Sequence, residues 1–303
     1  MTNLFEEEQS SLEIPPNWHF RMLNDKLRNE AYCQSLKRCI KPESVVLDLG
    51  AGCGLLSLLA AKLGAKHVYA IERNSILCES LKEHAIINGL KNKITVINKH
   101  SSDVNLLEDI KEKANILVTE IFDGALVGED CLKSINYVKQ NFLVKHGVVI
   151  PQKGSIQCAP ITSEQIRFEY QLNNNILDLN FSHFQRNCRI YEDRIRIKFY
   201  DHSYLGNSET LISIDFNENI KEVIDHSVSF KIQTSGIIDG LLVWFKLTLD
   251  DLVLENSSTS SIHWGQWLLV PKENFIVKKG DRLFVNINNN KGYLKAENWS
   301  LNL

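Results

Sequence analysis

Apolar residues in the first half of the chain fall into two kinds of stretch. Short, predominantly apolar runs are typical of strands buried on both faces of a parallel sheet. They occupy residues 45–47, 67–71, 94–97, 115–119 and 147–150. Between them, apolar positions recur with a helical period over residues 25–40, 55–63, 75–88 and 131–141. Strands that alternate with helices predict an α/β fold with a Rossmann-like parallel sheet.

The pattern changes after Pro151, where the helical period fades. Alternating and β-branched residues take its place and are typical of antiparallel strands with one face in water. Clear examples are residues 194–199, 227–232 and 283–287. We therefore expect an α/β domain over residues 17–151 and an antiparallel β-barrel or sandwich over residues 152–303.

Three further local signals complete this picture. Residues 1–16 end in two prolines and are expected to be a flexible lead-in. Asn24 or Asp25 can cap the first helix of the α/β domain. Residues 256–261 are asparagine, serine and threonine, which predicts a polar loop between strands.

Composition limits the kind of protein. The 303 residues are 44% hydrophobic and 23% charged, as in a soluble globular protein, and no stretch is long and apolar enough to span a membrane. The acidic N-terminus lacks a signal-peptide core, so we expect a cytoplasmic protein with no membrane partner. A net charge of -3 argues against a nucleic-acid partner. The seven scattered cysteines form no C-x-x-C pair or Cys/His cluster, which predicts free thiols and no metal site.

The first strand runs into a glycine loop that indicates a ligand site. Asp48 is followed by Gly50, Gly52 and Gly54, and Glu72 ends the next strand. The G-x-G-x-G spacing differs from the G-x-G-x-x-G of dinucleotide enzymes, and no Gly-Lys-Ser/Thr follows to hold a triphosphate. An acid before the glycines and another about 20 residues later suit a ligand with a cationic end and a ribose diol. S-adenosylmethionine has both, and the stretch resembles motif I of the class I methyltransferases.

Two later loops carry acids at strand ends. Ser102 and Asp103 follow the third strand, where either side chain could accept from an adenine amine, or Asp103 could cap a helix. Glu120 and Glu129 lie nine residues apart after the fourth strand, with Asp123 between them. Open α/β sheets place their chemistry in such loops, although solvated loop acids would give the same spacing.

With these residues assembled, the chain resembles the protein arginine methyltransferases. The resemblance covers roughly residues 17–303 and depends on five stretches. They are His19-x-x-Met22-Leu23-x-Asp25-x-x-Arg28, the glycine motif with Glu72, Ile97-Asn98-Lys99-His100-Ser101, Val118-Thr119-Glu120 through Gly128-Glu129, and Ser261-Ile262-His263-Trp264. The fourth stretch is similar to the family's double-glutamate loop, and its sequence is closest to that of the monomethylating branch. The last stretch is similar to the family's Thr-His-Trp loop.

The resemblance implies an acceptor site for a guanidinium, which arrives charged because its pKa exceeds about 12. Glu120 and Glu129 would grip its planar fork and point one nitrogen at the methyl group from about 3 Å. A His263–Asp25 pair would help the product lose its proton. The pocket would be walled by Trp264 and narrowed by Asp123, which would limit transfer to one methyl group.

The resemblance also implies the contacts to S-adenosylmethionine. Arg28 would bind its carboxylate, while His19 and Met22 would pack near the sulfonium. The full set of expected cofactor-binding residues is His19, Met22, Arg28, Asp48, Gly50, Gly52, Gly54, Glu72, Ser102, Asp103 and Glu120.

The chain departs from the family at four points that bear on the acceptor. Gln9 and Glu13 stand near where paired tyrosines are expected, and Ile262 replaces a threonine. The chain has one module where animal monomethylating enzymes have two, and the segment at about 165–190 is short for a dimerisation arm, although it could still make a homodimer. The absent tyrosines, the single module and the lack of strong acidity for arginine-glycine-rich peptides favour free L-arginine over arginine in a protein as the monomethylated acceptor. A methyltransferase of another small molecule and a non-catalytic binding module are the alternatives.

Overall fold

The computed structural model describes residues 17–128, 130–172, 176–188, 191–273, 275–289 and 293–302. The predicted lead-in, residues 1–16, lies outside the described residues. In the described part, no helix is long and apolar enough to cross a membrane.

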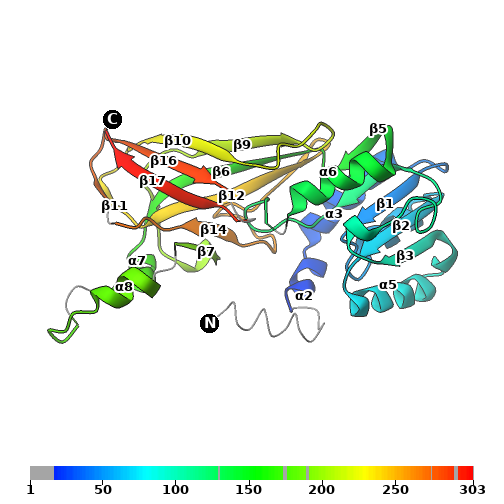
Figure 1. Ribbon diagram of the computed structural model, residues 1–303, viewed down its shortest axis with the longest axis horizontal. Helices are drawn as coiled ribbons and strands as arrows, with labels where there is room; N and C mark the ends of the chain where they lie inside the picture. The colour runs from blue at the N-terminus through cyan, green and yellow to red at the C-terminus, as the bar shows by residue number, and fades with distance from the viewer. Residues whose placement is uncertain are drawn as a thin grey trace.

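A five-stranded parallel sheet forms one end of the molecule, as the apolar runs predicted (Figure 1). Its strands lie in the order β3-β2-β1-β4-β5, so the order reverses between β1 and β4. The strands are β1 (Val45–Leu49), β2 (His67–Glu72), β3 (Ile94–Asn98), β4 (Ala114–Thr119) and β5 (Leu143–Ile150). Open α/β sheets bind ligands outside the carboxyl ends of the strands at such a reversal, which here brings the glycine loop and Glu120 together.

Apart from the helix over Trp18–Leu23, which was not predicted, the helices of this half begin and end close to where the sequence indicated. They are α2 (Trp18–Leu23), α3 (Lys26–Cys39), α4 (Leu55–Lys62), α5 (Ser75–Ile87) and α6 (Cys131–Phe142). Of the two predicted caps for α3, Asp25 is the one used, because its Oδ1 accepts from the backbone N–H of Arg28 at 3.1 Å. Asn74 caps α5 in the same way, with its Oδ1 3.0 Å from the N–H of Leu77. These caps satisfy orphan donors of the first turn and fix where each helix starts.

The second half consists of antiparallel sheets, as expected. A seven-stranded sheet has the order β7-β14-β12-β6-β8, with β13 beside β12 and β9 beside β6. Its strands are β6 (Lys153–Thr162), β7 (Glu192–Ile195), β8 (Ser203–Tyr204), β9 (Glu209–Asp215), β12 (Gly240–Leu249), β13 (Leu252–Glu255) and β14 (Gln266–Leu269). The smaller sheets contain β10 (Asp225–Lys231), β16 (Arg282–Asn288) and β17 (Lys295–Leu301), and β11 (Gly236–Ile238) with β15 (Phe275–Val277).

One strand prediction was wrong in part. The run 194–199 was expected to be a single strand, but β7 stops at Ile195 and a short 3-10 turn, η3 (Ile197–Phe199), follows. The backbone N–H of Ile197 donates to the side-chain Oε1 of Gln266 at 3.0 Å rather than to a strand. The alternation of apolar residues persists because Ile195 and Ile197 are both buried, yet it does not require a continued ladder.

Two helices project from the antiparallel half at the segment expected to be an arm (Figure 1). They are α7 (Glu164–Tyr170) and α8 (Ser182–Cys188). The base of α7 is fixed by the fully buried Asp239, whose carboxylate pairs with Arg167 at 2.8 Å and accepts from the N–H of Ser163 at 2.7 Å. Large apolar side chains farther out are exposed, Phe168 to 87% and Leu177 to 88%.

The two halves share one apolar core. A single cluster of buried side chains contains residues of the parallel sheet and of the antiparallel strands. Polar contacts also join them, since the Asn136 side chain donates to the carbonyl of Ile220 at 2.8 Å and accepts from its N–H at 3.1 Å. A continuous core transmits strain and resists sliding, so a site at the junction has fixed walls.

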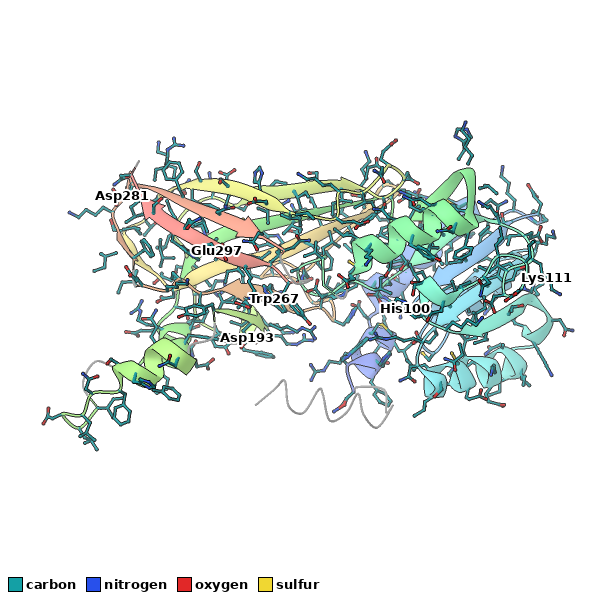
Figure 2. The ribbon with its side chains drawn as sticks, viewed as in Figure 1. His100, Lys111, Asp193, Trp267, Asp281 and Glu297 are labelled. Carbon is teal, nitrogen blue, oxygen red and sulfur yellow. The ribbon has the colours of Figure 1, made fainter. Side chains whose placement is uncertain are left out.

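The carboxyl ends of the parallel strands face this junction. In Figure 2, His100, which follows β3, lies at the inner end of the parallel-sheet half, and Lys111, which precedes β4, lies at its outer end. The loops that carry the predicted chemistry therefore meet the antiparallel half.

Candidate active site

The glycine loop after β1 has the conformation that its residues demand. Gly50, Gly52 and Gly54 all have positive φ, at 73°, 55° and 98°. A side chain at Gly50 would overlap Ile121, whereas one at Gly52 would meet nothing closer than 3.9 Å, the distance to His19 Cε1. The loop is thus closed toward the core and open at Gly52, toward α2.

Asp48 is fully buried near the end of β1, and only one of its two carboxylate oxygens has a hydrogen-bond partner in the described residues. Its Oδ2 accepts from the Ser57 hydroxyl at 2.7 Å, and its Oδ1 has no hydrogen-bond partner in the described part of the chain. Burial raises the pKa of this carboxyl to about 7, although bonds from Ser57 and the charge of Arg28 oppose the shift. A buried acceptor without a donor is costly, so this atom is available to a ligand.

Glu72 is held in place by the loop that it faces. Its Oε2 accepts from the N–H of Gly52 at 2.9 Å, and its Oε1 accepts from the N–H of Asn74 at 2.8 Å. An ionised carboxylate offers about four lone-pair positions. Glu72 therefore keeps acceptor capacity for the two hydroxyls of a ribose.

Helix α2 carries two of the predicted residues, His19 and Met22, and His19 lies beside the glycine loop. His19 is half-buried, stacks on Trp18 with ring centroids 4.0 Å apart, and has an Nδ1 without a partner in the described residues. Burial lowers the pKa of His19, which favours its neutral form. Met22 is buried. The neutral ring of His19 therefore lies beside Gly52.

Arg28 and Glu120 were both expected to contact S-adenosylmethionine, with Glu120 also holding the acceptor, and the structure pairs them with each other. The guanidinium and the carboxylate form an ion pair, and both side chains are about 95% buried. Arg28 also donates to the Asn29 side chain at 2.8 Å, while its Nε has no partner in the part of the chain described. The Glu120 carboxylate thus already holds a guanidinium, one belonging to the protein itself.

The structure also brings together His263 and Asp25, which are 238 residues apart in the chain. Asp25 Oδ2 lies 3.0 Å from His263 Nδ1 and accepts from the His263 backbone N–H at 2.7 Å. Burial raises the pKa of Asp25, but the bonds from His263 and from the N–H of Arg28 outweigh it and leave that pKa lowered. An ionised Asp25 can only accept, so Nδ1 of His263 carries the proton it donates and Nε2 is the ring nitrogen left to exchange a proton with a ligand.

Trp264 is buried and anchored to the Glu120 loop. Its Nε1 donates to the carbonyl of Phe122 at 3.0 Å, and its ring packs against those of His263 and Phe245. The indole therefore fixes the distance between the loop after β4 and the loop before β14.

Asn256 is a site residue that the sequence did not reveal. It was expected in a polar loop, yet it is completely buried. Its Nδ2 donates to the carbonyls of Gly124 at 3.0 Å and Gly265 at 2.6 Å, and its Oδ1 accepts from the N–H of Phe245 at 2.6 Å. One amide thus ties the Glu120 loop and the His263 loop to β12. The composition around Asn256 is typical of any surface loop, so no local signal could have found it.

Asp123 is committed to the backbone of its own loop. Its Oδ1 accepts from the N–H groups of Ala125 and Val127, both at 3.1 Å, and the carboxylate packs where a side chain at Gly128 would lie. Burial raises the pKa of Asp123, against these bonds and the charge of Arg194. Asp123 therefore shapes the loop between the two glutamates, whatever else it contacts. Glu129, the second glutamate, lies outside the described residues.

Ser102 and Asp103 remain exposed at the mouth of the site. They lie in a 3-10 turn, η2 (Ser101–Asp103), and the Ser102 hydroxyl donates to Asp103 Oδ1 at 3.1 Å. Asp103 does not cap a helix, which corrects one of the two readings of this residue, because the cap of the turn is His100. Both polar side chains are accessible to a ligand.

The residues present fit S-adenosylmethionine. Asp48 Oδ1 and Glu72 offer acceptors, Arg28 offers a cation for the amino-acid carboxylate, and His19 and Met22 offer an uncharged surface. In the described residues no group of His, Cys, Asp and Glu could hold a metal ion. The fold and this site together define a class I methyltransferase with S-adenosylmethionine as its methyl donor.

Comparisons with known proteins agree with this class. The family model described as ribosomal protein L11 methyltransferase (PrmA) matches residues 31–152. An arginine N(omega)-methyltransferase of Streptomyces achromogenes subsp. streptozoticus is 29% identical over 281 residues, which cover 88% of this chain and 74% of the relative. Mouse protein arginine N-methyltransferase 9 is 26% identical over 94% of this chain, but the chain spans only 38% of that relative's length.

Solved structures share the two-part architecture. The Trypanosoma brucei PRMT1 enzyme-prozyme complex with AdoHcy gives a TM-score of 0.79 at 24% identity, over 92% of this chain and 90% of that chain. PRMT6 with SAH gives 0.70 at 24% identity, over 94% and 99%. The chain is similar in sequence and in fold to S-adenosylmethionine-dependent arginine methyltransferases, and the resemblance drawn from the sequence is confirmed.

Proposed function

We propose that the protein is an arginine Nω-methyltransferase that transfers one methyl group to free L-arginine. The observation that carries this proposal is the Glu120–Arg28 pair, because it demonstrates a buried carboxylate in a geometry that accepts a guanidinium. When bound, S-adenosylmethionine supplies an electrophilic methyl group on a sulfonium and a carboxylate that can take over Arg28. Glu120 is then free to receive the guanidinium of the acceptor.

The residues around Glu120 supply the remaining chemistry. Together with Glu129, Glu120 would hold the acceptor fork and concentrate its positive charge away from the attacking nitrogen. The transferred methyl leaves an extra proton on that nitrogen, and His263 can accept it at Nε2 because Asp25 holds Nδ1–H. Trp264 and the apolar surface beside it exclude water from the loops. The shaping of the loop by Asp123 supports a pocket that admits one methyl group.

Two observations support free L-arginine as the acceptor. The Streptomyces relative named arginine N(omega)-methyltransferase matches over most of both chains, whereas the animal relatives are matched over 38% of their length. The names of those animal relatives favour the second candidate, a protein arginine N-methyltransferase.

We also propose a homodimer through the projecting segment of α7 and α8, whose exposed apolar side chains would be covered by a second copy. Light scattering after size exclusion would give the mass, and a monomer at working concentration would refute the dimer.

The test offers labelled S-adenosylmethionine with L-arginine or with an arginine-glycine-rich peptide, followed by mass spectrometry. Glu120→Gln should abolish transfer, and Glu112→Gln is the matched control because Glu112 is exposed and paired with Lys66 far from the site. Methylated peptide alone would favour the second candidate. Full methyltransferase activity of the Glu120→Gln variant would refute the assignment of an arginine acceptor.

A further inference from the structure

Arg194 and Arg196 bracket the end of β7 beside the acceptor loops. In the sheet, Ile195 pairs with Gln266 and Arg194 pairs with Trp267. An Nη2 of Arg196 donates to the carbonyl of His263 at 2.5 Å. A side chain at Gly265 would lie 3.6 Å from Arg194 Cγ. Both arginines are therefore carried on the backbone that supports the His263 loop.

A third arginine, Arg21, lies on α2, the helix that carries His19 and Met22. Burial lowers the pKa of Arg196, and the positive charges of Arg21 and Arg194 lower it further. The charge of Arg194 also reaches the buried carboxyl of Asp123. Arg21 and Arg194 thus each lie within electrostatic reach of Arg196, and Arg194 is also within reach of the Glu120 loop.

None of these three arginines forms an ion pair with a carboxylate in the described part of the chain. Arg28, Arg38 and Arg167, by contrast, each have an acidic partner. Like charges that gather without counter-charges cost free energy, more so when one of them is half-buried. Such an arrangement is offset when an anion binds between the cations.

The cluster also opens onto a space that a ligand can enter. Arg194 and Arg196 line a cleft of about 780 Å³ between β7 with η3 on one side and α7 on the other. Figure 2 shows Asp193 of β7 between the antiparallel sheet and α7, and its carboxylate accepts from the Tyr170 hydroxyl of α7 at 2.7 Å. Glu164 and Glu169 on the α7 wall lie beyond ion-pair distance of the arginines.

These charges bear on which acceptor the site admits. A guanidinium that approaches three arginines is repelled, and a cationic arginine-glycine-rich peptide would be repelled more. An acceptor that carries a carboxylate near its guanidinium would instead be drawn in and oriented. Free L-arginine carries one on its α-carbon, and a peptide could supply one from a flanking aspartate.

We propose that Arg21, Arg194 and Arg196 form a subsite for a carboxylate of the acceptor, at the mouth of the guanidinium site. This inference rests on the proposed function and makes it more specific, because it names the second group that the acceptor must carry. The α-carboxylate of free L-arginine is the source that the small-molecule function predicts. The subsite would select by charge, since an arginine that binds carboxylate through two N–H groups gains both energy and orientation.

Agmatine is the discriminating probe, because it keeps the guanidinium and amine of L-arginine and lacks the carboxylate. We expect kcat/KM for L-arginine to exceed that for agmatine at least tenfold, since a charge-assisted hydrogen bond is worth roughly that factor or more. Arg21→Gln and Arg194→Gln replace exposed side chains and should bring the ratio toward one, chiefly through KM. Arg282→Gln on β16, far from the site, is the matched control and should leave the ratio unchanged.

The second arm uses peptides with aspartate or glycine beside the arginine. If the wild type prefers the aspartate peptide, and the variants lose that preference, then the carboxylate comes from a peptide and the subsite is supported. Equal kcat/KM for L-arginine and agmatine, with no preference among the peptides, would overturn the subsite while the arginine-methylating function stands. Failure of the wild type to methylate any guanidino compound would overturn both.

Discussion

Replacing Asn256 with alanine should lower the free energy of unfolding and loosen the contact between the Glu120 loop and the His263 loop. The substitution removes three hydrogen bonds, two of them buried and one partly buried, to the carbonyls of Gly124 and Gly265 and from the N–H of Phe245. At about 1 kcal/mol net for each bond, the free energy of unfolding should fall by about 3 kcal/mol. Urea denaturation followed by tryptophan fluorescence measures this loss.

The same variant should be impaired in catalysis under conditions where it stays folded. Without the amide, the Glu120 loop and the His263 loop can shift relative to one another, and small misplacements of reacting groups lower kcat/KM about tenfold or more. Asn88→Ala is the control, since that amide makes one exposed bond, to the carbonyl of His84 at 2.8 Å. A loss of stability below about 1 kcal/mol with unchanged kcat/KM would refute the role of Asn256 as a tie.

Three further predictions follow from the described contacts. Because Arg28 occupies Glu120, L-arginine should bind about tenfold more tightly when S-adenosylhomocysteine is present, and calorimetry showing equal affinities would contradict this. Because the pKa of Asp48 is raised from 3.8 to about 7, the folded protein binds the extra proton between these values, so its stability should fall as pH rises through that window and level off above it. Asp48→Asn should remove this slope in denaturation measured from pH 4 to 8, and an unchanged slope would refute the assignment. Asp123→Ser should permit some dimethylation in mass spectra of the product, and strictly monomethylated product would count against its limiting role.

Local pattern was sufficient for the parallel sheet and for most helix ends. The strand over Val45–Leu49 is buried at every residue, which is why its apolar run was readable without a partner. Asp25 and Gly54 mark helix starts through bonds and dihedral angles within a few residues. The glycine loop was also predictable from local sequence, because its conformation is dictated by residues that lack a Cβ.

The resemblance to a family made it possible to predict the acceptor-site residues, because it related residues that local periodicity cannot relate. Asp25 and His263 are 238 residues apart, and no apolar period relates a cap on α3 to a loop before β14. The pairing depends on two sheets that share one core.

Only the tertiary structure decided which polar groups face each other. Arg28 and Glu120 lie 92 residues apart and were expected to contact ligands, yet each is the other's partner. Asn256 is buried in a stretch whose composition predicts a surface loop, and Arg196 leaves its strand to bond the His263 loop. The sequence determined the elements because hydrogen bonding and burial within an element act over a few residues. The structure decided the site because charges and amides are satisfied by whichever groups the packed core brings within 3 Å or so.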